Sequence, residues 1–245
     1  MIRCLSELTG YDINAIDGKV GSCVDFLFDD QSWTVRHLVV DTGGWIPGRK
    51  VIVPPSSINR VNWKDGELDL EFNKKKLEES PSLSKDAPVS RQYEEKYYNY
   101  MGWPPYWGLG FTMRSGFNPR NTDIEREQSK NTIVTTTRSF KEVLGYEISN
   151  KEDTFGSVED VIVSDANWKV TGFVVRLSKW LPSDRVIMPL SDIEEISWLG
   201  QSLNSLKTKE QIKALQKYSP HDGVNAVSEV RFYDYTGHPV SEKTV

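Results

Sequence analysis

Long apolar runs are absent from this sequence. None approaches the roughly 18 consecutive apolar residues that a helix needs to cross a bilayer, although hydrophobic residues make up 38% of the chain. Residues 1–8 contain no basic region followed by an apolar stretch, so they do not have the pattern of a secretory signal. We therefore predict a cytoplasmic location without membrane insertion, and leave open a peripheral association with a membrane complex.

Cysteine and histidine are scarce. The two cysteines, Cys4 and Cys23, do not have metal-binding or redox spacing, and we expect both to be buried free thiols. The three histidines, His37, His221 and His238, stand at none of the spacings that zinc sites use. We therefore predict that the chain binds no metal and no other cofactor.

Positive charge is not in excess, because 30 Lys and Arg residues stand against 35 Asp and Glu residues, for a net charge of −5. Nonspecific binding to nucleic acid depends on neutralising phosphates with basic side chains, so a nucleic-acid partner is not expected. Catalytic signatures are also missing: the sequence has no Gly-x-Ser-x-Gly elbow and no glycine motif for phosphates or dinucleotides. We expect a protein that is not an enzyme.

What the sequence does contain is one long stretch written twice. Residues 10–63 return as residues 145–198 at a constant offset of 135 positions, without a gap. Such self-similarity indicates repeated structural units. The residues shared by the two copies are turn glycines, prolines, core aliphatics and tryptophans, which are the residues of a scaffold.

The first copy has the pattern of short strands. Val, Ile and aromatic residues recur between turn clusters such as Asp17-Gly18, and Pro54 ends a strand because proline donates no ladder hydrogen bond. The expected strands are residues 11–16, 22–28, 34–41, 50–53, 58–63 and 67–72, the last two forming a hairpin around Gly66. Six short strands with frequent turns are typical of a small antiparallel barrel or sandwich.

A short helix and an aromatic arm follow each copy. Thr208 and Gln211 have the spacing of a helical capping box, and residues 73–77 are the shorter counterpart. Each helix precedes a tyrosine-rich pattern, at residues 98–104 and 233–239, which we expect to pack on a barrel. The predicted fold is therefore mainly β, with two tandem small barrels, each followed by a helix and an arm.

The predicted domains follow from this pattern. Residues 115–131 are polar and mark the boundary between the halves. The expected organisation is a first barrel at residues 1–80, an aromatic arm and linker at 81–131, a second barrel at 132–218 and a C-terminal arm at 219–245.

The repeated stretch resembles the PRC-barrel family, named for the cytoplasmic domain of the photosynthetic reaction-centre H subunit. The resemblance rests on residues 18–21, 24–29, 35–45 and 49–54, and it is weaker in the second copy. It implies a six-stranded β-barrel used as an assembly or adaptor module, with no catalytic residue set. Members include the H subunit, the C-terminal domain of a ribosome maturation factor and free-standing bacterial and archaeal proteins.

Two sets of duplicated residues have alternative interpretations. Asp25 and Asp160 recur in an apolar strand, either as functional carboxylates with perturbed pKa values or, as we favour, as hydrogen-bond acceptors at a bulge or a barrel end. Asp30 and Asp165 recur in turns, where Asp caps its own backbone. The tryptophan pairs suit base stacking or packing, and we favour packing: Trp33/Trp168, Trp45/Trp180 and Trp63/Trp198.

The candidate partner-binding residues fall into two groups. The first is the loop after the third strand of the first copy, of which the second copy reproduces only the tryptophan: Asp41, Gly43, Gly44 and Trp45. The second is the aromatic arm, which is either a binding hot spot or docked within the chain: Tyr97, Tyr98, Tyr100, Trp103, Tyr106 and Trp107. His37 and residues 176–185 are further features that the copies do not share.

The expected function is a non-catalytic adaptor or assembly module that binds an unidentified protein partner. Two alternatives remain open: an RNA- or ribosome-assembly-linked binding protein, and a soluble peripheral partner of a photosynthetic or electron-transport membrane complex. A second copy of the chain is a further candidate partner. The ungapped offset also predicts that the two units pack with approximate two-fold symmetry.

Overall fold

The computed structural model describes residues 1–81, 91–106, 137–150, 153–177 and 184–218. These residues are mainly β, as predicted, and form two sheets of seven strands each. The predicted C-terminal arm at 219–245, most of the predicted linker, Trp107 and Trp180 lie outside the described residues.

The first unit contains six strands of its own, in the spatial order β5-β4-β3-β2-β7-β6. Its elements are β2 (Asp12–Ala15), β3 (Gly18–Asp29), β4 (Thr34–Asp41), β5 (Lys50–Val53), η1 (Pro55–Ser57), β6 (Ile58–Asn62), β7 (Glu67–Leu70) and α2 (Lys74–Glu78). The bounds of β4 and β5 are those predicted from the sequence. The edge strands β5 and β6 follow one another in the chain and are joined by η1.

The second unit repeats this order as β12-β11-β10-β9-β14-β13. Its elements are β9 (Glu147–Ser149), β10 (Thr154–Ser164), β11 (Val170–Arg176), β12 (Arg185–Pro189), η2 (Leu190–Asp192), β13 (Ile193–Ser197), β14 (Ser202–Ser205) and α6 (Lys209–Lys213). The capping box predicted for the last helix is present, since Thr208 and Gln211 exchange both of its hydrogen bonds.

The expectation of purely antiparallel sheets was wrong in one respect. β2 pairs with β7 in parallel, and β9 pairs with β14 in the same way. A tight turn can join only antiparallel neighbours, whereas parallel neighbours need a long connection. The strands of each pair are far apart in sequence, so the chain between them is long enough for parallel pairing.

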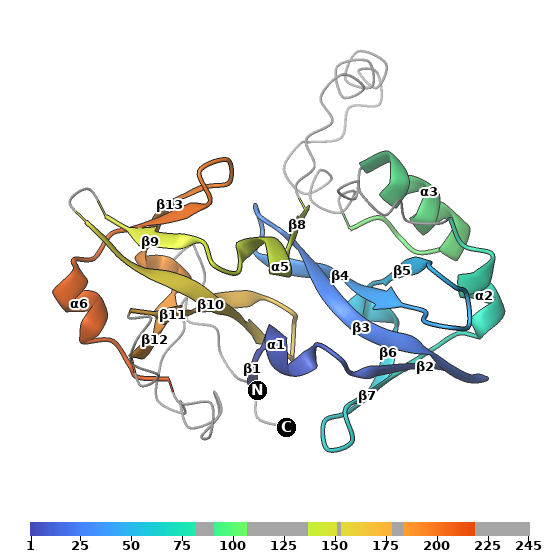
Figure 1. Cartoon of the computed structure of the whole chain (residues 1–245). Helices are drawn as coiled ribbons and strands as arrows, with labels where there is room; N and C mark the ends of the chain where they lie inside the picture. The colour runs from blue at the N-terminus through green and yellow to red at the C-terminus, as the bar shows by residue number, and fades with distance from the viewer. Residues whose placement is uncertain (82–90, 107–136, 151–152, 178–183, 219–245) are drawn as a thin grey trace, which may run out of the picture.

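The seventh strand of each sheet comes from the segment that precedes the other unit. β1 (Ile2–Cys4) pairs with β10, and β8 (Thr137–Ser139) pairs with β3. Figure 1 shows this exchange, with β1 beside β10 and β8 beside β3. The predicted boundaries at residues 1–80 and 132–218 therefore do not coincide with the two sheets. Short helices, α1 (Leu5–Leu8) and α5 (Phe140–Val143), follow the exchanged strands.

The recurring aspartates Asp25 and Asp160 hold the exchanged segments in place. Each lies next to a β-bulge. Asp25 accepts hydrogen bonds from the Ser139 hydroxyl at 2.7 Å and the Lys141 backbone N–H at 3.2 Å, while Asp160 accepts from the hydroxyl and N–H of Ser6. The interpretation of these acids as hydrogen-bond acceptors at bulges is confirmed.

Asp30 and Asp165 have a different role from the predicted one. The described contacts place each beside an arginine of an exchanged strand, with Arg138 Nε 3.3 Å from Asp30 and Arg3 Nε 3.4 Å from Asp165. The turn after β3 is instead capped by Asp29, which accepts from two backbone N–H groups. The sequence places these acids in turns but does not show that an arginine from the other half reaches them.

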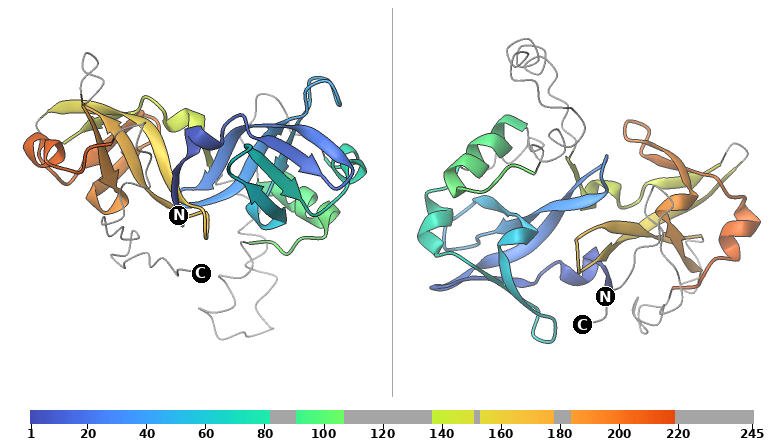
Figure 2. Two further views of the ribbon diagram at one scale, coloured as in Figure 1. Left: turned by 90° about the horizontal axis from the view of Figure 1, so that it is seen from below. Right: turned by 180° about the vertical axis from the view of Figure 1, so that it is seen from behind.

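The backbone hydrogen bonds between the units are symmetric, as the constant offset predicts. The Val35 N–H donates to the Trp168 carbonyl at 2.8 Å, and the Val170 N–H donates to the Trp33 carbonyl at 2.7 Å. Both tryptophans have positive φ, 52° and 58°, so the same unusual backbone turn occurs at both positions. Figure 2 shows the two units side by side with the N-terminus between them.

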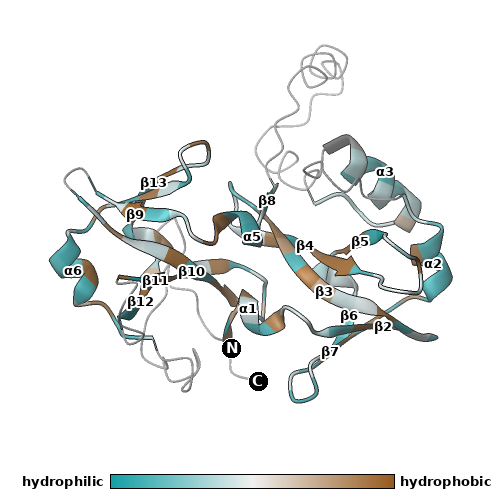
Figure 3. Ribbon diagram, viewed as in Figure 1, coloured by the Kyte–Doolittle hydropathy of each residue, from teal (hydrophilic) through white to brown (hydrophobic). Residues whose placement is uncertain are grey.

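One hydrophobic core cluster extends through both units. The Trp33 ring stacks on Phe28 of its own unit and meets Phe173 of the other unit edge-on, with ring centroids 6.0 Å apart in the second pair. These contacts support packing as the role of Trp33. In Figure 3, hydrophobic residues gather on the inward sides of α2 and α6 and hydrophilic residues on their outward sides.

Within the described part of the chain, no helix has the length and apolarity required to cross a membrane.

Candidate functional site

A cleft of about 680 Å³ opens on the first unit where β4 ends. It contains all four predicted loop residues. The lining residues come from β2 and the residues just before it, from β3, and from the end of β4 with the loop after it: Gly10, Asp12, Lys19, Val20, Gly21, Ser22, Val24, Asp41, Thr42, Gly43, Gly44 and Trp45. The sequence analysis selected the loop side of this cleft and missed the strand side.

The loop is shaped by two glycines and one threonine. Gly43 has φ +57°, a left-handed conformation that favours glycine, and its N–H donates to Asp41 Oδ1 at 2.8 Å. The buried Thr42 hydroxyl lies 2.7 Å from the Ile46 carbonyl oxygen. Below the loop, a Cβ on Gly21 would lie 1.9 Å from the Asp41 carbonyl oxygen, so only glycine allows β3 and the end of β4 to approach this closely.

The cleft combines an apolar floor with charged groups at its rim. Val20 is buried beneath it, and Trp45 packs in part against the core. At the rim, Lys19 Nζ lies 2.6 Å from Asp12 Oδ2, and Lys74 Nζ lies 5.2 Å from the centre of the Trp45 ring. This mixture offers both apolar contact and hydrogen-bonding groups to a bound molecule.

The second unit carries a different group at the equivalent place. Glu159, which corresponds to Val24, forms ion pairs with Arg176 at 2.5 Å and Arg185 at 2.6 Å. Burial raises the pKa of Glu159, but hydrogen bonds from Arg185 and Arg176 outweigh this effect and lower the pKa to about 2. A carboxylate therefore occupies the position of Val24, and its two guanidinium partners stand where the first unit has Asp41 and Lys50.

The aromatic arm is docked on the first sheet. Its first part is α3 (Arg91–Met101), which lies alongside β4 and β5 (Figure 1). The Tyr97 hydroxyl is buried and donates to the Ile52 carbonyl at 2.5 Å, and burial raises the Tyr97 pKa, so the phenol stays protonated. Tyr98 is also buried, and Trp103 packs against both tyrosine rings and the core.

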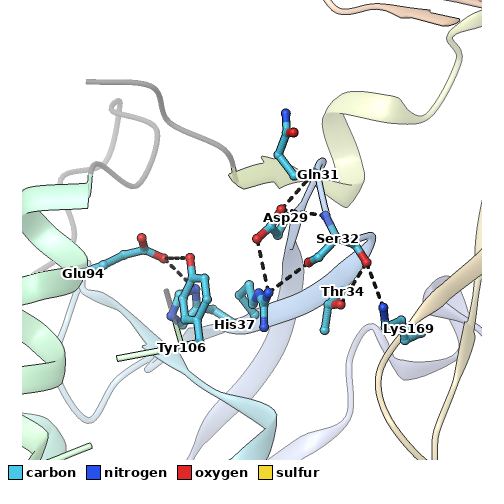
Figure 4. Close-up of polar contacts among 9 residues, drawn as sticks. Asp29, Gln31, Ser32, Thr34, His37, Glu94, Tyr106 and Lys169 are labelled. Carbon is cyan, nitrogen blue, oxygen red and sulfur yellow. Dashed lines mark hydrogen bonds and ion pairs between the residues drawn. The ribbon is translucent and has the colours of Figure 1, made fainter. Parts of the chain in front are cut away.

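A buried histidine lies at the centre of this docking. His37, on β4, is fully buried, and its Nδ1 lies 3.6 Å from Oε1 of Glu94, which is 2% exposed. The Tyr106 hydroxyl donates to the same carboxylate at 2.9 Å. Figure 4 shows the three side chains converging between the sheet and α3. Because the second unit has Gly172 in place of His37, this cluster belongs to the first unit alone.

A second polar group links the docked arm to the seam between the units. Arg36 packs over the Tyr106 ring at 4.1 Å and hydrogen-bonds Ser32 Oγ at 2.9 Å. Lys169 Nζ of the second unit donates to the Ser32 carbonyl at 3.3 Å (Figure 4). Arg36 and Ser32 of the first unit thus lie between the arm and Lys169 of the second unit.

The predicted residues thus separate into two places. The loop residues line the open cleft, whereas Tyr97 and Tyr98 face the chain's own sheet and Tyr100 remains 38% exposed. Sequence reasoning missed Glu94 and Arg36, whose importance follows only from their position beside His37 and Tyr106. Among the described residues, no three His, Cys, Asp or Glu side chains form a group that could hold a metal ion.

Comparison with known proteins adds no family assignment. No protein-family model matches the chain, and no curated protein matches its sequence.

Proposed function

We propose that this chain is a tandem protein of the PRC-barrel type that acts as a non-catalytic adaptor. In this proposal the cleft at Asp41 and Trp45 binds a segment of a protein partner, and the second unit and the docked arm keep the first unit rigid. The observation that carries the proposal is the difference between the units: an open cleft in one and an ion-paired cluster in the other.

The chemistry of the cleft suits a peptide segment. Trp45 and Val24 supply apolar contact, and aromatic residues are frequent anchors in protein interfaces. Asp12, Lys19 and Asp41 supply charged and hydrogen-bonding groups around this apolar part, which is the arrangement of an apolar centre with a polar rim. In the second unit Lys19, Val24 and Asp41 are replaced by Thr154, Glu159 and Arg176, whereas Trp45 recurs as Trp180.

The proposal is tested with the full chain as bait and quantitative mass spectrometry of the proteins that copurify. Trp45→Ala and Asp41→Lys are compared with the wild type, and Leu199→Ala is the matched control because Leu199 is fully exposed on the second unit. We expect one set of partners to be lost with both cleft variants and retained with the control. Circular dichroism confirms that all variants are folded.

Two results would overturn the proposal. Equal recovery of every partner by the wild type and both cleft variants would remove the cleft as the binding site. Loss of all partners after nuclease treatment would favour the RNA-linked alternative over an adaptor of proteins.

A further inference from the structure

The second sheet carries a small apolar cluster on its outer face. Its buried members are Cys4, Ile162, Val174 and Ile187, and the partly buried side chains packed on them in the described part of the chain are Ile2 and Tyr218. Val174 and Ile187 pair across β11 and β12, so they point to the same side of the sheet. Val174 is fully buried and Ile187 almost so.

In the first unit, the corresponding face of the sheet is covered by α3. The counterparts of Ile162, Val174 and Ile187 at the offset of 135 are Leu27, Val39 and Ile52. α3 lies over this face, with the Tyr97 hydroxyl bonded to the Ile52 carbonyl and the Tyr98 ring 5.7 Å from that of His37. An outer apolar face in this fold is therefore closed by an aromatic helix.

The sequence contains a counterpart of α3 at the same offset, in residues 229–239, outside the described residues. The pairs are Glu94/Glu229, Tyr97/Phe232, Tyr98/Tyr233, Tyr100/Tyr235, Gly102/Gly237 and Pro104/Pro239. The described chain ends along the edge of β12, where the Ile187 N–H donates to the Gln216 carbonyl at 2.9 Å. From there the Tyr218 side chain packs on the cluster, with its hydroxyl 3.5 Å from Cys4 Sγ. Phe232 follows Tyr218 closely enough in sequence to reach the cluster.

We infer that the outer face of β10, β11 and β12 is the docking surface for the chain's own residues 229–239. Phe232 takes the place of Tyr97 over Ile187, and Tyr233 takes the place of Tyr98. Gly172 stands in place of His37, so the contact of Tyr98 with the imidazole ring has no equivalent in the second unit, and the inference rests on the apolar cluster alone. The inference goes beyond the adaptor function and does not depend on it.

Hydrogen–deuterium exchange of the full chain tests this docking without any partner. Phe232→Ala removes the ring placed over Ile187, and we expect the peptide covering Arg185–Pro189 to exchange about tenfold faster or more. Tyr235→Ala is the matched control, because its counterpart Tyr100 is 38% exposed whereas Tyr97 is fully buried. We expect little change at the same peptide in this control.

The outcomes distinguish the inference from its alternatives. Unchanged exchange of β12 in Phe232→Ala, or an equal effect of both variants, would overturn it. If the segment docks within its own chain, wild-type exchange at β12 does not depend on protein concentration. Faster exchange on dilution would show that the segment comes from a second copy, and would overturn the inference.

Discussion

Gly21 illustrates how one residue determines the shape of the cleft. It lies where β3 passes beneath the end of β4, and the Asp41 carbonyl occupies the space that a side chain would need. A Cβ on Gly156, at the same position in the second unit, would lie 2.8 Å from the Arg176 carbonyl oxygen. The two glycines therefore serve the strand crossing and not the cleft's chemistry.

Gly21→Ala is expected to destabilise the protein strongly. The added Cβ would collide with backbone that has no rotamer to change, and overpacking of this kind costs about 1–3 kcal/mol or more. Gly44→Ala is the matched control, since a Cβ there meets no atom within 4 Å. Urea denaturation measures both variants, and equal stability of the two would contradict the close approach at Gly21.

Glu159 leads to a prediction about pH. Its folded-state pKa of about 2 lies below the ordinary value of 4.5, so its ion pairs contribute stability that is complete above about pH 4.5. That contribution is lost as the pH falls towards 2, because the unfolded chain then binds the proton more readily. Glu159→Gln is expected to lower stability at pH 7 and to reduce the loss between pH 4.5 and 2.

The measurement is the denaturant midpoint of wild type and Glu159→Gln across this pH range. Glu195→Gln serves as the control because Glu195 is an exposed acid of the same unit. A pH profile of Glu159→Gln that parallels the wild type would show that the paired carboxylate does not contribute to acid sensitivity.

At the scale of elements, α3 is held by polar contacts as well as by its aromatic rings. Glu94 is buried beside His37 and accepts from the Tyr106 hydroxyl. A buried polar group that loses its partner costs more than the hydrogen bond itself. The docking of the helix is therefore sensitive to a residue that composition and periodicity do not single out.

Glu94→Ala is expected to loosen α3 by about 1–3 kcal/mol, because it leaves His37 and Tyr106 without this carboxylate. Amide exchange over residues 93–101 measures the local opening free energy. Glu95→Ala, an exposed neighbour on the same helix, is expected to have little effect. Equal exchange in both variants would show that the rings alone hold the helix.

At the scale of the whole molecule, the exchange of β1 and β8 joins the two units into one folding unit. Each sheet is completed by a strand that precedes the other unit, and each exchanged segment is held by an aspartate of the sheet it joins. The hydrophobic cluster is continuous through both units. Neither unit is complete on its own.

Met188→Ala is therefore expected to destabilise both units together. Met188 is fully buried in the second unit, and its truncation costs about 2–5 kcal/mol. Circular dichroism and tryptophan fluorescence should give one coincident denaturation transition, at lower denaturant than the wild type. A first unit that stays protected from amide exchange after the second has unfolded would contradict this coupling.

The sequence by itself determined the repeat, the strand pattern and the symmetry of the two units. Alternating apolar residues, turn glycines and prolines are local signals, and they placed β4 and β5 at their observed bounds. The constant offset required equivalent contacts on the two sides, as the reciprocal bonds of Trp33 and Trp168 show. Asp41, Gly43 and Gly44 could be selected because the second copy does not share them, whereas Trp45 recurs as Trp180.

The tertiary structure alone decided how the halves interlock and what the unshared residues touch. Arg3 and Arg138 recur at the same offset, yet only the strand exchange shows that each meets an aspartate of the other half. The pairing of His37 with Glu94 joins positions far apart in sequence. The physical reason is that local pattern fixes which face of a strand is buried, whereas the partner of a buried polar group depends on which distant segment the packed chain brings to it.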